Sequence, residues 1–110
     1  MSSKTYQVIV RGKFAPLDDG QRARLLAEAE EHNLFQARFT LDGTVTYERA
    51  LLMFTFRCLV PATEEEKEAV VIGRAEALAA AAIRALGADF QDLESVATDL
   101  DSIKIRRRGR

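Results

Sequence analysis

The sequence predicts an α+β fold of the ferredoxin-like βαββαβ type, a four-stranded antiparallel sheet with two helices on one face. Three observations carry this prediction. Apolar and polar residues alternate along 5–14, 35–41 and 44–60; helix-capping signals follow the first and third of these segments; and a last short alternating segment closes the chain. With 110 residues, 47% of them hydrophobic, the chain suits one core, so we predict a single domain over 1–105 and a basic tail over 106–110.

The first half of the chain is predicted to form a strand, a helix and a second strand. Along 5–14, the residues Tyr6, Val8 and Val10 share one face, as in a half-buried strand. Asp18 followed by Gln21 matches a capping box for a helix over 19–32. Alternation returns over 35–41, and the dipeptide at 42–43, Asp-Gly, is a strong signal for a type I′ hairpin turn.

The second half is predicted to supply the central strand, a long helix and a last strand. The third strand begins at 44–47, is interrupted at 48–50, and resumes over 51–60. Its core face should hold Leu52, Phe54, Phe56, Cys58 and Val60. Thr63 with the acids after it indicates a capped helix that ends at Leu86, with Gly87 at the C′ position, and 93–98 forms the last strand.

The face of the sheet that the helices leave open should mix apolar and basic side chains. Its predicted members are Gln7, Ile9, Arg11, Gln36, Arg38, Thr40, Leu51, Met53, Thr55, Arg57 and Leu59. A monomer seldom exposes so many apolar groups in one patch, so we expect a homodimer through this face, with the two sheets forming a dimeric α+β barrel.

These patterns favour a small association or ligand-binding accessory module without a cofactor, and a non-enzyme over an enzyme. The alternative is a small cofactor-free enzyme of the dimeric α+β barrel type, like the monooxygenase and polyketide-cyclase groups. A small-molecule ligand would then meet a polar lining formed by Arg11, Arg38, Tyr47 and Arg57. No residue is assigned a catalytic role.

The sequence lacks the residues that a metal site, a reactive thiol, a phosphate-binding loop or an RNA-binding face would need. His32 is predicted at a helix end and Cys58 on a core face, and neither has neighbours at metal-ligand spacing. The glycines are scattered singly, so the chain has no phosphate-binding loop. Acids at 64–66 and at 68 fit a helix cap, and Tyr47 with Glu48 fits a kink in the third strand. RNA recognition on the open face would require stacking aromatics, which its predicted members lack.

Charge is distributed unevenly along the chain. Residues 1–103 carry 11 basic and 17 acidic side chains, whereas 104–110 carry five basic side chains and no acid. We expect the tail to be solvated or to dock on the acidic body, which makes nucleic-acid binding through it the less favoured interpretation. No secretory signal or membrane span is apparent, and a single cysteine fits a reducing compartment, so we expect a cytoplasmic protein.

Several stretches resemble a family of short actinobacterial proteins catalogued as a domain of unknown function. They are the opening VIVRGKF, the helix sequence LDDGQRARLLAEAEEH, the central TYER with FTFR, and ATDL before the basic end. The resemblance covers nearly the whole chain and implies one domain. It implies no site residues, because these stretches match strands, caps and turns.

Overall fold

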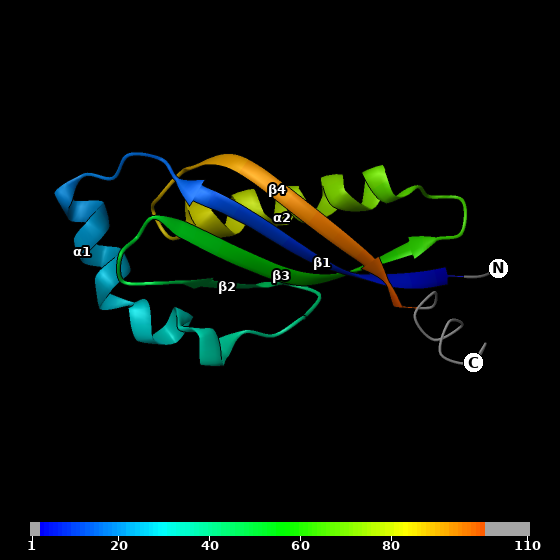
Figure 1. The fold of residues 1–110 in the computed structure, drawn as a ribbon, viewed down its shortest axis with the longest axis horizontal. Coiled ribbons are helices and arrows are strands. Elements are labelled where there is room, and N and C mark those ends of the chain that lie inside the picture. Colours follow the sequence, from blue (N-terminus) through cyan, green and yellow to red (C-terminus); the bar gives the residue numbers. More distant parts are fainter. Residues whose placement is uncertain (1–2, 101–110) are drawn as a thin grey trace.

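The computed structural model describes residues 3–100, which form an α+β fold around one antiparallel sheet (Figure 1). The predicted tail over 106–110 lies outside the described residues. The elements are β1 (Ser3–Phe14), α1 (Asp19–Ala27), two 3₁₀ turns (Ala29–His32 and Leu34–Gln36), β2 (Thr44–Tyr47), β3 (Met53–Thr63), α2 (Glu68–Ala85) and β4 (Phe90–Asp99). The strands lie in the order β2-β3-β1-β4.

The centre of the sheet is the long pairing of β1 with β3, which runs from Ser3 opposite Thr63 to Lys13 opposite Met53. Alternate side chains of both strands face the core, as the period-2 pattern predicted. The fully buried members of this face include Val8, Val10, Phe56 and Cys58. The predicted core face of β3 is therefore confirmed, except for Leu52, which is 70% exposed.

Helix α2 lies along one face of the sheet and closes the core (Figure 1). Its buried stripe is Val71, Ala75, Ala79 and Ile83, and the two alanines allow close approach to the strands. The helix begins at Glu68, later than predicted, because residues 63–66 form a turn of their own. In that turn the Glu66 carboxylate accepts the Thr63 N–H and pairs with Arg74, and these contacts lower the pKa of Glu66 to about 2.

Helix α1 begins at the predicted capping box but ends before the predicted boundary. The Asp18 carboxylate accepts the Gln21 N–H at 2.7 Å, and the Gln21 side chain returns a bond to the Asp18 N–H at 2.8 Å. The α-helix stops at Ala27 and continues as a 3₁₀ turn. Figure 1 shows α1 beyond the end of the sheet, with Leu25 buried in the core, so α2 alone lies along the sheet face.

The predicted strand over 35–41 is wrong. Asn33 caps a 3₁₀ turn by accepting the Phe35 N–H at 2.9 Å, and the Arg38 guanidinium donates to the carbonyls of Phe35 and Ala37. These local bonds occupy the groups that a strand would use for its ladder. Phe35 is 87% exposed as a result, and Thr40 alone forms an isolated bridge, to Cys58.

The predicted interruption over 48–50 is the hairpin turn itself. The Leu51 N–H donates to the Glu48 carbonyl at 2.9 Å, and Leu51 has φ of 57°, a left-handed value. This turn reverses the alternation at its exit, so Leu51 is buried although it was predicted on the open face. The Asp-Gly pair is not a type I′ turn, because only its glycine, Gly43, has positive φ.

Candidate functional site

The open face of the sheet lies opposite α2, and the pairing register defines its members. Residues directly opposite each other on paired strands point to the same side. One row places Arg57 beside Ile9 and Ile9 beside Val96. The next row places Thr46 and Thr55 beside Arg11 and Glu94. The predicted members on β1 and β3 are confirmed, while Gln36, Arg38 and Leu51 do not belong to this face.

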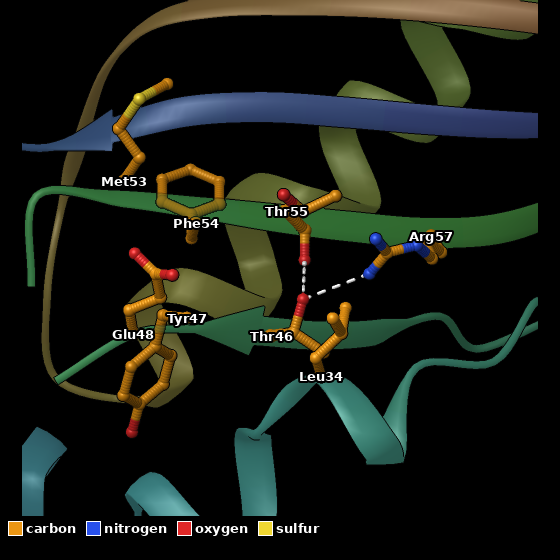
Figure 2. A pocket seen from close by; sticks show the side chains of 8 residues that line it. All are labelled: Leu34, Thr46, Tyr47, Glu48, Met53, Phe54, Thr55 and Arg57. Carbon is orange, nitrogen blue, oxygen red and sulfur yellow. Dashed lines mark hydrogen bonds between the residues drawn. The ribbon is translucent and has the colours of Figure 1, made fainter.

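A hollow of about 210 Å³ opens where β2 and β3 meet the second 3₁₀ turn (Figure 2). It is lined by Leu34, Thr46, Tyr47, Glu48, Met53, Phe54, Thr55 and Arg57. Apolar side chains, two threonines and two opposite charges thus surround one small volume. Such a mixture is typical of a site that orients a polar ligand against apolar walls.

Arg57 is the most unusual group in this hollow. Its Nη1 donates to the Thr46 hydroxyl at 3.0 Å, and the Thr46 hydroxyl donates in turn to the Thr55 carbonyl at 3.5 Å. Within residues 3–100, every other arginine and lysine either is exposed or pairs with an acid within 4.0 Å. Arg57 is partly buried and has no acid partner there, and its side chain bonds the Thr46 hydroxyl instead.

Glu48 stands at the opposite end of the hollow from Arg57 (Figure 2). It is exposed at the start of the turn that follows β2. The two charges line the same hollow without forming an ion pair within 4.0 Å. The hollow therefore offers a cationic end and an anionic end, with Thr46 and Thr55 between them.

The other three residues predicted to line a site do not share this hollow as side-chain ligands. Arg11 is exposed on the open face and lines a separate hollow of about 480 Å³ with Lys13, Asp92 and Glu94 among its neighbours. Arg38 caps its own loop through bonds to two backbone carbonyls. Tyr47 borders the hollow of Arg57, but its phenol points away from it (Figure 2).

Tyr47 is a core residue of the covered face. Its hydroxyl donates to the Leu25 carbonyl at 2.7 Å, and its ring stacks on that of His32 with centroids 5.2 Å apart. Burial, together with the nearby charges of Glu28 and Glu31, raises the pKa of Tyr47 to about 12. The phenol is therefore neutral at ordinary pH and joins α1 to β2.

The remaining reactive side chains have structural roles. His32 donates from Nδ1 to the Val45 carbonyl at 2.9 Å, which fixes the 3₁₀ turn against β2. Cys58 is fully buried, and burial raises the pKa of its thiol. Residues 3–100 contain no group of three histidine, cysteine or acidic side chains placed to hold a metal ion. No helix in the described part of the chain is long and apolar enough to cross a membrane.

Beyond the end of β2, a third and mostly apolar groove of about 650 Å³ runs between β3 and α2. Leu41, Leu59, Pro61 and Leu78 are among its lining residues. Within residues 3–100, the edge of β3 here pairs only with the segment around Thr40, through the bond from the Leu59 N–H to the Thr40 carbonyl. Pro61 has no N–H to offer, and its carbonyl accepts from Arg74 at 3.4 Å, so this edge is protected against further pairing.

Leu34 and Thr46 are the hollow residues that the sequence patterns did not single out. The alternation of Val45 and Tyr47 toward the core implied that Thr46 faces outward, so Thr46 could have been found. Leu34 could not, because the strand predicted over 35–41 left no place for the 3₁₀ turn that brings Leu34 to the hollow.

The chain matches the model of a family of unknown function (DUF6204) over residues 1–110, so it belongs to that family. A search of curated proteins found no match. A search of solved structures found none either.

Proposed function

We propose that this member of the family is a small accessory module that forms a homodimer through the open face of its sheet and binds a small ligand there. The observation that carries the proposal is the apolar content of a sheet face that neither α1 nor α2 covers. Val96 is 56% exposed and Met53 is 49% exposed, and Ile9 and Leu59 are partly exposed beside them. Apolar groups on one continuous sheet face are typical of an interface between identical subunits.

The arrangement of the strands supports this proposal. Read from the β4 edge, the order β4-β1-β3-β2 supports a ferredoxin-like arrangement, in which two sheets can pack face to face. The open face also carries both signs of charge. Arg11 lies beside Glu94, and Arg57 lies in the adjacent row of side chains. A two-fold axis through this face would let basic side chains of one subunit approach acids of the other.

Sedimentation velocity on the full chain tests the dimer. We expect a dimer at tens of micromolar for the wild type and a monomer for Val96→Lys, because lysine would place an unpaired charge inside the interface. Val70→Lys is the matched control, since Val70 is 46% exposed but lies on α2, away from the open face. A monomeric wild type, or equal dissociation by both variants, would exclude this interface.

The second candidate is a cofactor-free enzyme of the dimeric α+β barrel type. The hollow beside Arg57 favours it, because two facing sheets would enclose that hollow between them. The position of Tyr47 weighs against it, because its phenol bonds the Leu25 carbonyl and is not available to a substrate. We therefore favour binding over catalysis. A cytoplasmic location is part of the proposal, supported by one buried, unpaired thiol at Cys58.

A further inference from the structure

We infer that the hollow beside Arg57 binds a small organic carboxylate whose opposite end carries a hydrogen-bond donor, such as an amino- or hydroxycarboxylate. This inference deepens the ligand-binding part of the proposed function. It does not require the dimer, because all the residues involved belong to one protomer.

The cationic end of the hollow selects the carboxylate. A guanidinium has five N–H donors in a planar fork, and Arg57 uses one of its nitrogens on the Thr46 hydroxyl. No buried side-chain nitrogen among residues 3–100 lacks a partner, so the remaining donors of Arg57 reach solvent and are open to a ligand that replaces water there. A carboxylate fits a guanidinium with two parallel bonds, so it satisfies both the charge and the geometry.

The size of the hollow limits the ligand. A water molecule occupies about 30 Å³ in the liquid, so a volume of about 210 Å³ holds a molecule of about seven non-hydrogen atoms. Leu34 and Met53 line the same volume and would contact the carbon chain of such a molecule. A nucleotide is too large to fit wholly within the hollow of one protomer.

The anionic end selects the other group of the ligand. Glu48 lies at the end of the hollow away from Arg57, and a carboxylate there repels a second anionic group (Figure 2). An amine or hydroxyl at that end would instead donate to Glu48. A ligand with one carboxylate and one donor therefore matches the hollow better than a dicarboxylate does.

Titrations of the full chain, labelled with ¹⁵N and followed by NMR, test this inference. The probes are pentanoate, 5-aminopentanoate, pentanamide and pentylamine, which share a chain length and differ in their end groups. We expect saturable shifts of the backbone amides of Thr46, Glu48, Thr55 and Arg57 with the two carboxylates. The neutral amide should bind at least tenfold more weakly than pentanoate, because it lacks the charge-assisted bonds.

Variants separate the two ends of the hollow. Arg57→Gln should weaken both carboxylates at least tenfold, and Arg57→Lys should weaken them less, because it retains the charge but not the fork. Arg11→Gln is the matched control on the same face and should change affinity less than twofold. Glu48→Gln should weaken 5-aminopentanoate severalfold without weakening pentanoate. An amide spectrum of each free variant verifies that it folds.

Three results would overturn the inference: no saturable shift at the hollow with either carboxylate, equal affinity for pentanoate and pentanamide, or equal losses from Arg57→Gln and Arg11→Gln. Sedimentation of the same samples separates this inference from the dimer. If Arg57→Gln dissociates the dimer and no probe binds to the wild type, Arg57 is an interface residue and only this inference fails. If a monomeric wild type binds the carboxylates, only the proposed dimer fails.

Discussion

The two faces of the sheet use the same strands for opposite purposes. On the covered face, side chains such as Val8, Val10 and Phe56 are fully buried in the core. On the open face, their immediate neighbours Ile9, Arg57 and Thr55 remain partly exposed and mix apolar, cationic and hydroxyl groups. The covered face therefore supplies most of the apolar burial that stabilises the protomer. The open face contributes less to folding, so its composition is free to serve binding.

Truncating one residue on each face is the most direct test of this difference in stability. Phe56→Ala should lower the free energy of unfolding by about 3–5 kcal/mol, because it leaves a cavity in the core where the ring packs beside Gly43. Met53→Ala, on the open face, should cost less than about 1 kcal/mol, since Met53 is already half exposed. Urea denaturation at concentrations below dimer formation measures both. Similar costs for the two variants would show that the faces are not energetically distinct.

Two glycines test the role of packing, because the space around them differs. A Cβ on Gly12, in β1, would lie 2.6 Å from the Phe54 ring and 2.7 Å from Leu93, so Gly12→Ala should cost about 1–3 kcal/mol. A Cβ on Gly73, on the exposed side of α2, meets nothing within 4 Å. Gly73→Ala should therefore add about 0.5–1 kcal/mol through helix propensity. Thermal unfolding should shift in opposite directions for the two variants, and shifts of the same sign would contradict this account.

Tyr47→Phe tests the hydrogen bond that joins β2 to α1 through the Leu25 carbonyl. Tyr47→Phe should cost about 1 kcal/mol at neutral pH by removing the bond to the Leu25 carbonyl. The pKa of Tyr47 is raised to about 12 in the folded protein, above the ordinary value of 10, so deprotonation favours the unfolded chain. The contribution of Tyr47 should be complete below pH 10 and be lost as the pH rises toward 12.

The pH dependence of Tyr47 is measured as the stability difference between wild type and Tyr47→Phe across that range. Tyr6→Phe is the control. Tyr6 is as buried as Tyr47, but it lies near the start of β1, whereas Tyr47 lies at the end of β2. The alkaline loss should persist in Tyr6→Phe and disappear in Tyr47→Phe. Its persistence in Tyr47→Phe would assign the loss to other groups.

Prediction from the sequence succeeded where a local pattern and the tertiary contacts agree. The alternation in β1 and β3, the capping box of Asp18 and the C′ glycine Gly87, with φ of 86°, all appear in the structure. It failed over 35–41, where apolar residues alternate without belonging to a strand. Side-chain bonds from Asn33 and Arg38 to the backbone outcompete a sheet ladder there, and no periodicity reports such bonds.

The candidate site was predictable to the same extent. Arg11 and Arg57 lie on the open face as the parity of their strands required. Arg38 does not, because its strand does not exist, and Tyr47 faces the core because its short strand pairs Tyr47 with Phe54. Parity thus fixes the side on which a residue lies once the register is known, but it does not fix the register itself.

By itself, the sequence determined the two long strands, the long helix and the chemical contrast between the two faces of the sheet, because each follows from spacing within a few residues. Only the tertiary structure decided that a 3₁₀ turn carries Leu34 to β2, and that Glu48 and Arg57 line one hollow without pairing. Those facts depend on contacts between segments that are distant in the chain. These contacts depend on side chains that bond the backbone and on the direction of each turn. Neither feature produces a hydrophobic period in the sequence.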